Sequence, residues 1–506
     1  MKKIFKYILT AGLVAMTAAC DMNLQPTDSV VVENGKVEIR TGQELFSFYM
    51  GILSNFRAVH NGYFYTTEEL MLDGFNATSS YGNNYGDVHR VEIKAGDDYI
   101  ESFWSDHYTV IKNYNILIDA LHDYIPEGYE ADANDILGNA FLFRADAYLQ
   151  LIRHFAPAYR KDDIDDTTGS LGVPLVVHYS LSERPARATI GEVYEQIVED
   201  LDSAYVRLKE VPGEIGALTG TIDAVRALQA RAALDMGDYK LAVAKTDTLI
   251  KSKIYSLAST AAAMETEFRE DGGNEPIMQM AANKSDEKPS SISVYTNCGS
   301  SLQYSLCFKS LYLPSEKLVN AYSDGDLRKA SWFTNSLYYT EVNGSYYRGD
   351  FYTFIKYLGN PELYSGKTPD GTQAVKPYTI SEIYLINAEA NAQGGDRNAA
   401  KTSLNVLQNA RKATATSGSL GNIKNEWFKE TVGQGLRLSC LKRWGDGYEE
   451  RKGQAGAIRD NALMTGDRYT EKSLDADDYH LVWPIPAHDM RLNPNLIQNP
   501  GYGTAD

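Results

Sequence analysis

Apolar side chains recur every three or four residues along much of this chain, and that spacing places them on one face of an α-helix. Residues 99–124 and 132–156 show the pattern most clearly, and helical patterning begins near Thr41. The sequence therefore predicts two long amphipathic helices over these ranges. The apolar positions are Ile100, Phe103, Trp104, Tyr108, Ile111, Tyr114, Ile118 and Leu121 in the first segment, and Leu137, Phe141, Tyr148, Leu151 and Phe155 in the second.

The start of a further helix is indicated by Thr189, which Glu192 follows three residues later. This is a capping-box pattern, in which both side chains accept hydrogen bonds from backbone N–H groups at the start of a helix. We therefore expect a helix that runs to about Leu208. Thr221 can cap the next helix in the same way.

Two pairs of predicted helices are joined by very short reversals. One reversal lies in "DMGDYKLA" (235–242) and the other is "QGGD" (393–396). Alanines crowd both sides of each reversal, and small side chains let two helices approach closely. This is typical of tetratricopeptide-like helix pairs, although no fixed 34-residue period is present. We interpret the pairs as elements of an irregular solenoid; two unrelated helical hairpins are the alternative.

Two segments, 58–98 and 285–378, do not follow the helical pattern. They are rich in tyrosine, asparagine, glycine and serine, which is typical of loops and short strands. In "YYTEVNGSYY" two aromatic stretches flank Asn343 and Gly344, a pattern that favours a β-hairpin. Because binding residues often lie in loops held by a rigid frame, we expect these segments to carry the binding surface.

The N-terminus has the three parts of an export signal. Lys2, Lys3 and Lys6 precede an apolar stretch, and small residues then lead to Cys20. The segment resembles a bacterial lipoprotein signal, in which this cysteine is acylated, although Thr17 stands where leucine is usual. We expect a signal peptide at 1–19, a lipidated tether at 20–40 and a single domain at 41–506, with halves of about 41–260 and 261–506. Ordinary secretion is the alternative.

Composition narrows the classes of function further. The formal charge is −18, so the chain has no electrostatic reason to bind nucleic acid or anionic lipid. Tyrosine outnumbers phenylalanine by 35 to 16, and its apolar ring with a polar tip suits both recognition surfaces and half-buried helix contacts. Cys298 and Cys307 are able to pair, a question that the sequence leaves open, but Cys440 would remain single, so this is not a disulfide scaffold.

Enzymatic and metal-binding motifs are not apparent. The chain has no HExxH or GxSxG motif, and its eight histidines are scattered. The acidic clusters 162–166 and 475–478 lack the spacing of a calcium loop. A glycosidase needs two carboxylates at close range, and nothing in the sequence indicates such a pair. We expect neither catalysis nor a cofactor nor a metal.

Several segments resemble the SusD/RagB family of outer-membrane lipoproteins from Bacteroidetes. The resemblance spreads over nearly the whole mature chain, and the proline-rich closing segment is its most specific part. The matching segments are "FRADAYLQLIRHF" (143–155), "GVPLVVHYSLSERPARATIGEVYEQIVEDLDSA" (172–204), "ALQARAALDMGDYKLAVA" (227–244), "SDGDLRKASWF" (323–333), "SEIYLINAEANAQGGDRNAAKTSLNVLQNAR" (381–411) and "LVWPIPAHDMRLNPNLIQNPGYG" (481–503).

The resemblance implies an all-α scaffold of four tetratricopeptide-like helix pairs with a loop-rich face and a few short strands. It also implies a location at the outer membrane, exposed at the cell surface, and a partner, a SusC-like TonB-dependent transporter on which the lipoprotein sits as a hinged lid. Family members usually bind glycans, and some bind peptides. One departure concerns "VGQGLRLSCLKRWG", where Gln434 and Cys440 replace acidic residues, so buried ion pairs expected at this segment would be missing.

Glycan recognition needs aromatic rings for the C–H faces of sugars, and amides or guanidinium groups for their hydroxyls. The first irregular segment offers these groups within ten residues, and the second offers further rings; a polar surface loop and core packing are the alternatives. The residues expected to bind ligand are Tyr81, Asn83, Asn84, Tyr85, His89, Arg90, Tyr295, Asn297, Trp332, Tyr346 and Tyr347.

We therefore expect a lipid-anchored protein that captures oligosaccharide or polysaccharide for import. Three alternatives remain open: the same lid binding peptides, a secreted glycoside hydrolase, and an assembly scaffold without a small ligand.

Overall fold

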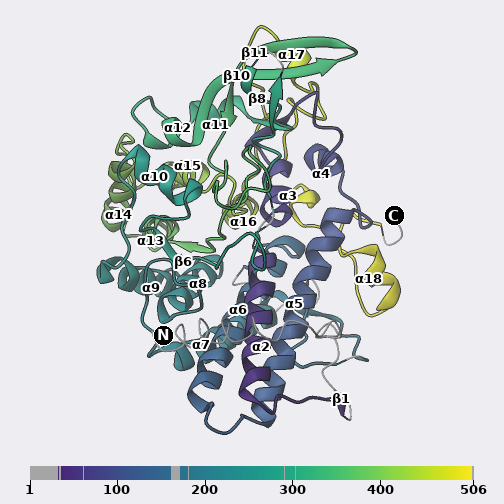
Figure 1. Ribbon diagram of the computed structural model, residues 1–506, viewed down its shortest axis with the longest axis vertical. Coiled ribbons are helices and arrows are strands. Elements are labelled where there is room, and N and C mark those ends of the chain that lie inside the picture. The colour runs from purple at the N-terminus through teal and green to yellow at the C-terminus, as the bar shows by residue number, and fades with distance from the viewer. Residues whose placement is uncertain are drawn as a thin grey trace.

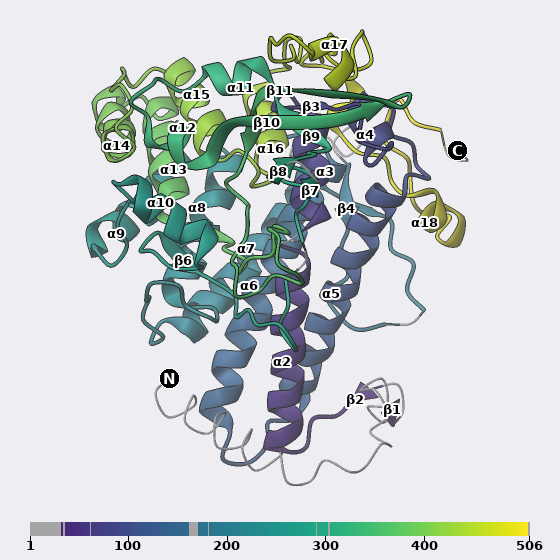
Figure 2. The same cartoon turned by 45° about the horizontal axis from the view of Figure 1, so that its top comes forward.

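The computed structural model describes residues 32–33, 36–60, 62–160, 171–180, 182–289, 291–301 and 304–503. Helices dominate and the strands are short (Figures 1 and 2), which confirms the predicted fold class. None of the helices in these ranges has both the length and the apolar character needed to cross a membrane.

Helices packed against their neighbours form the frame of the molecule. Helices α5 and α6 are the two long amphipathic helices that the sequence predicts, and α2 packs beside both. The frame helices are α2 (Gly42–Ala58), α5 (Asp98–Asp123), α6 (Glu130–Phe155), α7 (Ile190–Leu208), α8 (Ile222–Asp235), α9 (Tyr239–Ser252), α13 (Ile380–Gln393), α14 (Arg397–Ala410) and α15 (Leu420–Glu430).

The array continues across a long excursion of the chain. Helix α9 packs against α13, although residues 253–379 separate them in sequence. Helix α13 then packs against α14 and α15. The excursion carries most of the strands, and Figure 2 shows its long hairpin lying across the end of the array. The frame is thus built from helices that precede and follow residues 253–379 in sequence.

The predicted helix boundaries are confirmed at the residues that specify them. The Thr189 hydroxyl accepts a hydrogen bond from the backbone N–H of Glu192, the reciprocal bond of the capping box is present, and α7 ends at Leu208. Thr221 caps α8 by accepting from the backbone N–H of Ala224. The two short reversals lie between α8 and α9 and between α13 and α14, as the alanine-rich pairs predict.

The first irregular segment contains more helix than the sequence predicts. Residues 58–98 include α3 (Tyr63–Met71) and α4 (Gly86–Arg90) beside β3 (Phe75–Ala77). Seven of the nine residues of α3 are buried, so it has no polar face to give the sequence an amphipathic period. The prediction of an irregular segment is therefore wrong for 63–71.

The second irregular segment forms short strands, as predicted. Strands β10 (Phe333–Val342) and β11 (Ser345–Phe354) make a hairpin in a four-stranded sheet of order β11-β10-β8-β7. Its turn is Asn343–Gly344, with φ of 51° and 76°, which confirms the hairpin signal. The remaining strands are β1 (Val32–Glu33), β2 (Lys36–Val37), β4 (Leu171–Pro174), β5 (Arg187–Thr189), β6 (Pro276–Met278), β7 (Cys298–Ser301), β8 (Tyr304–Phe308), β9 (Tyr312–Pro314) and β12 (Tyr378–Thr379).

Two large clusters of buried side chains hold these parts together. The first is formed by the apolar faces of the array helices. The second is rich in aromatic rings and lies between the excursion and the chain around β3, with Phe75, Tyr295 and Phe354 in mutual ring contact. Short helices complete the fold: α10 (Ala261–Arg269), α11 (Glu316–Asn320), α12 (Leu327–Trp332), α16 (Arg437–Trp444), α17 (Arg459–Ala462), α18 (Ala487–Leu492) and the 3₁₀ turn η2 (Tyr479–Leu481).

Residues from the far end of the chain cap the C-terminus of α6. The last carbonyls of a helix have no partner within it and need one when they are buried. The Lys442 ammonium donates to the carbonyls of Arg153 and Ala156. The backbone N–H of Trp483 donates to the His154 carbonyl at 2.8 Å. The Asn499 amide donates to the Phe155 carbonyl at 2.9 Å. The proline-rich closing segment thus completes a helix of the N-terminal half.

Buried ion pairs are present around α16, although the neutral residues Gln434 and Cys440 stand at positions where acids were expected. Arg437 forms a two-pronged pair with Asp73, at 2.9 and 3.0 Å. Arg443 pairs with Glu389 at 2.8 Å and with Asp235 at 3.0 Å. The expectation that these pairs would be missing is wrong, because acids from three distant elements supply them.

Candidate functional site

The loop 78–85, between β3 and α4, lies against the β10–β11 hairpin. Figure 2 shows the outer end of the hairpin above α4. The Thr340 hydroxyl on β10 is 2.9 Å from the Ser79 hydroxyl and 2.7 Å from the Ser80 hydroxyl. The two irregular segments of the sequence therefore meet in space, and we define the hairpin face as this loop together with residues 338–347.

The backbone of the loop is held in an uncommon conformation. Gly82, Asn83 and Tyr85 all have positive φ, between 56° and 60°. Asparagine tolerates this region, but an aromatic residue seldom adopts it. The half-buried Tyr85 ring stacks on Tyr99 of α5, with ring centroids 4.1 Å apart and an interplanar angle of 15°. This stack fixes the Tyr85 ring at the end of the loop.

Polar groups of the loop form a connected network. The Tyr81 hydroxyl lies 3.0 Å from the Tyr469 hydroxyl. The Arg90 guanidinium donates to the Tyr81 hydroxyl at 3.1 Å and to the Asn83 carboxamide oxygen at 2.8 Å. Burial and the hydrogen bond with Tyr469 raise the pKa of Tyr81 to about 12, so its phenol stays protonated. The network presents neutral hydroxyl and amide groups.

The charges beside this network compensate each other. Glu92 accepts hydrogen bonds from Arg468 at 2.6 Å and from Arg90 at 2.9 Å. These two bonds lower the pKa of Glu92 to about 2, so it is ionised at neutral pH. Asp87 also pairs with Arg90. The cations of the loop are therefore matched by carboxylates.

The hairpin carries tyrosines on both of its faces. Tyr346 is 65 % exposed and stacks on Tyr339, with ring centroids 5.5 Å apart and an interplanar angle of 22°. The Lys309 ammonium lies 5.0 Å from the centroid of the Tyr339 ring. Tyr347 is half-buried and pairs with Thr340 across the strands, so it lies on the face that meets the loop. Tyr346 is thus the most accessible ring of the expected set.

Three of the expected ligand residues belong to the core. His89, Tyr295 and Trp332 are 0 %, 1 % and 2 % exposed, so none can touch a ligand at the surface of this structure. His89 accepts from the backbone N–H of Ala77 at 3.3 Å and lies 2.7 Å from the Leu70 carbonyl. Burial lowers its pKa, so the ring is neutral.

The other expected residues differ in accessibility. Asn83, Asn84 and Asn297 are exposed, whereas Tyr81 and Arg90 are each 7 % exposed and present their polar ends to the loop. Several residues that contact the expected ligand residues or the hairpin tyrosines were not predicted, because most of them lie far away in sequence. These residues are Tyr99, Lys309, Tyr339, Arg468 and Tyr469. Cys20 lies outside the described residues. Among the described residues, no group of three or more His, Cys, Asp or Glu side chains is arranged to hold a metal ion.

Two family models match the chain. One is described as starch-binding associating with outer membrane and matches residues 32–234. The other is described as the SusD family and matches residues 282–502. Among curated proteins, none matches this chain.

Solved structures share the fold at low sequence identity. A SusD superfamily protein from Bacteroides thetaiotaomicron VPI-5482 is 22 % identical, with a TM-score of 0.73 over 90 % of this chain and 99 % of that one. A SusD superfamily protein from Bacteroides vulgatus ATCC 8482 is 22 % identical, with a TM-score of 0.72 over 92 % and 100 %. A laminarin binding SusD-like protein is 19 % identical, with a TM-score of 0.67 over 92 % and 100 %. Since the two family models cover both halves of the chain and the fold matches throughout, the chain belongs to the SusD/RagB family.

Proposed function

We propose that this protein is a cell-surface, lipid-anchored binding protein that captures oligosaccharide or polysaccharide and delivers it to a SusC-like TonB-dependent transporter in the outer membrane. Acylation at Cys20 would hold it there, and residues 20–40 would serve as the tether. It binds its ligand without altering it. The family's outer-membrane association and the laminarin-binding relative support this proposal.

The observation that carries the proposal is the composition of the hairpin face. The exposed Tyr346 ring, supported by Tyr339, offers an apolar surface for the C–H face of a sugar. The loop against the opposite face of the hairpin adds the amides of Asn83 and Asn84 and the hydroxyl of Tyr81, which are donors and acceptors for sugar hydroxyls. The hairpin and its loop thus offer both rings and neutral polar groups, which glycan recognition requires.

The charges of this face favour a neutral glycan. An anionic ligand would need a cation that is free to pair with it. Arg90 and Arg468 instead share Glu92, and breaking that arrangement would leave a carboxylate beside the ligand. We therefore propose that the ligand carries no sulfate or carboxylate group where it meets Arg90 and Arg468; Lys309, which lies against the Tyr339 ring, is a cation on the other side of the hairpin.

A peptide ligand is the second candidate, and one observation favours it. Strand β11 is the outer strand of its sheet, so an extended peptide has an edge to pair with. The inner end of this edge is already occupied, because Gln454 bonds to both the N–H and the carbonyl of Tyr352 at 2.9 Å. The short free edge makes the glycan the better candidate. A glycoside hydrolase is the third candidate.

Calorimetric titration of the purified protein with a panel of neutral, sulfated and uronic oligosaccharides, and with peptides, tests the proposal. We expect binding of a neutral glycan, loss of affinity in Tyr346→Ala and none in Tyr124→Ala, which removes an exposed tyrosine at the far end of α5. Chromatography of the recovered ligand should show no shortened product. Binding of peptides alone, or release of product, would contradict the proposal.

A further inference from the structure

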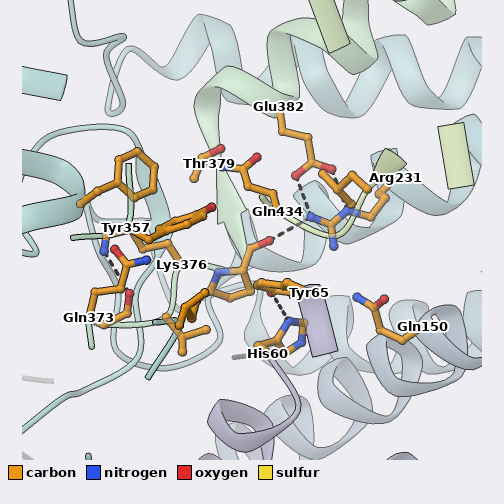
Figure 3. A pocket seen from close by; sticks show the side chains of 16 residues that line it. His60, Tyr65, Gln150, Arg231, Tyr357, Gln373, Lys376, Thr379, Glu382 and Gln434 are labelled. Atoms are coloured by element: carbon orange, nitrogen blue, oxygen red, sulfur yellow. Dashed lines mark hydrogen bonds and ion pairs between the residues drawn. The ribbon is translucent and has the colours of Figure 1, made fainter. Parts of the chain in front are cut away.

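A pocket remote from the hairpin face lies between the helical array and the chain that leads into β12. It is partly open to solvent, has a cavity volume of about 50 Å³, and is lined by residues of α6, α8, α10 and α13 and by the loops around them (Figure 3). None of its lining residues belongs to the loop 78–85 or to residues 338–347. It is therefore a separate feature of the molecule.

Three glutamine side chains border this pocket without hydrogen-bond partners among the described residues. Gln150 projects from α6, Gln373 from the chain before β12, and Gln434 from the loop between α15 and α16 (Figure 3). Gln150 and Gln373 are each 6 % exposed, and the carboxamide oxygen of Gln373 is buried without a partner. An unsatisfied buried amide oxygen is costly, so the Gln373 oxygen points to a molecule that hydrogen-bonds in this cavity, where the amides of Gln150 and Gln434 also lack partners in the described part of the chain.

The backbone on each side of Gln434 is fitted to the rings of the pocket. Gly433 and Gly435 have φ of 79° and 64°, which glycine adopts at little cost. A Cβ atom on Gly433 would lie 2.5 Å from the ring of Tyr357, and one on Gly435 would lie 2.8 Å from the ring of Tyr65. The two glycines thus let the backbone on each side of Gln434 lie against these two aromatic rings.

The charged residues of the pocket are already paired. Arg231 binds the Glu382 carboxylate at 2.6 and 2.7 Å and the Pro377 carbonyl at 2.9 Å. Lys376 donates to Asp271 at 2.8 Å, and His60 lies 2.6 Å from Asp146. Gln434 itself stands where the resemblance leads one to expect an acid. Only neutral amides remain for a ligand, so the ligand is neutral.

The volume of the cavity limits the size of the ligand. One water molecule needs about 10–15 Å³ of such a cavity, so this one holds about four water molecules. A molecule that replaces them and satisfies amide groups between aromatic rings has three or four carbons, each bearing a hydroxyl. We propose that the pocket is a second binding site, independent of the hairpin face, for a small neutral polyol of the size of glycerol or erythritol.

Saturation-transfer NMR with erythritol and glycerol as probes tests this assignment on the purified protein. We expect transfer from the protein to both probes, and an affinity for erythritol lowered about tenfold in Gln434→Leu and in Gln150→Leu, since each loses a hydrogen bond. Gln43→Leu, which replaces an exposed glutamine on α2, should leave the affinity unchanged. Glucose, which is too large for the cavity, should not compete.

The two pocket variants lie on different elements, so a folding defect in one does not remove the test; thermal unfolding identifies such a defect. Tyr346→Ala should leave erythritol binding intact, which separates this site from the proposed glycan surface. Absence of transfer in the wild-type protein, transfer that persists in both pocket variants, or displacement by glucose would each overturn the assignment.

Discussion

The hydroxyl groups of Thr340 and Ser80 lie 2.7 Å apart, although 260 residues separate them in sequence. Thr340 also lies within hydrogen-bonding distance of Ser79, so one threonine on the hairpin holds two consecutive residues of the loop. These contacts fix the position of the loop relative to the hairpin. A substitution that removes them should therefore change the affinity for a ligand, even one that touches neither residue.

Thr340→Val tests this joint. Valine keeps the shape of threonine but leaves the two serine hydroxyls without their partner, at a cost of about 1–3 kcal/mol. We expect faster amide hydrogen exchange in residues 78–85 and weaker glycan binding. Thr248→Val, on the exposed side of α9, is the control. Unchanged exchange in the loop would show that the joint does not order it.

Tyr346→Ala should weaken binding of the glycan by roughly 1–2 kcal/mol, because it removes the most exposed ring of the hairpin face. Titration calorimetry measures the effect. The unfolding free energy should hardly change, since the ring projects into solvent. If affinity is retained while Tyr124→Ala reduces it, the ligand binds at the other end of the molecule.

Tyr85→Ala and Tyr81→Ala should each lower glycan affinity by about 1–2 kcal/mol. Tyr85 loses its stack on Tyr99, and Tyr81 loses the hydroxyl that connects Tyr469 with Arg90. Because Tyr81 is mostly buried, its variant should also be less stable, so urea unfolding accompanies its titration. Identical isotherms for both variants and the wild type would discard this loop as part of the binding surface.

Glu267→Gln should change how stability depends on pH. Burial, followed by the charge of Glu275, raises the pKa of Glu267 from 4.5 to about 8. Between these values the folded chain binds more protons than the unfolded chain, so the unfolding free energy of the wild type falls as the pH rises. Glutamine has no proton to lose at this position.

Unfolding by urea from pH 5 to pH 9 should therefore show the Glu267→Gln variant gaining stability over the wild type as the pH rises. Glu265→Gln lies on the same helix but replaces a more exposed side chain, and it is the matched control. Parallel pH profiles for Glu267→Gln and the wild type would contradict the prediction.

Arg411→Met should destabilise the protein by about 3–5 kcal/mol. Arg411 is 1 % exposed and pairs with Glu275 at 2.7 Å and with Glu430 at 2.5 Å. Its loss leaves buried Glu275 without its cation and Glu430 paired, among the described residues, with Arg328 alone. Denaturant unfolding measures the cost. Arg397→Met, at an exposed position on α14, should change stability by less than about 0.5 kcal/mol. If Arg411→Met is as stable as the wild type, the prediction is wrong and neighbouring cations neutralise the carboxylates.

The helices whose apolar residues form one face were predictable from sequence. One side of such a helix is buried and the other faces solvent, so apolar residues recur every three or four positions. Helix α3 was not, since it is buried almost all round and carries no such period. Boundaries such as Thr189 and Thr221 were predictable because a cap depends on residues only three positions apart.

The candidate site was less predictable, because burial depends on contacts that are distant in sequence. Tyr295 and Trp332 stand in polar stretches, yet the aromatic cluster that encloses them draws on rings from residue 75 to residue 428. Likewise, the partner of Tyr81 is Tyr469, 388 positions later. Amino-acid composition identifies the segments that reach the surface. It does not identify which side chains in those segments are exposed.

The capping of α6 has a consequence for how the chain is made. Most partners of the carbonyls at the end of this helix come from Lys442, Trp483 and Asn499, while Arg187 adds one long bond to the Phe155 carbonyl. A nascent chain still emerging from the ribosome lacks Trp483 and Asn499, so its first half cannot reach its final packing during synthesis. The end of α6 therefore reaches its final packing only after the whole chain has been released.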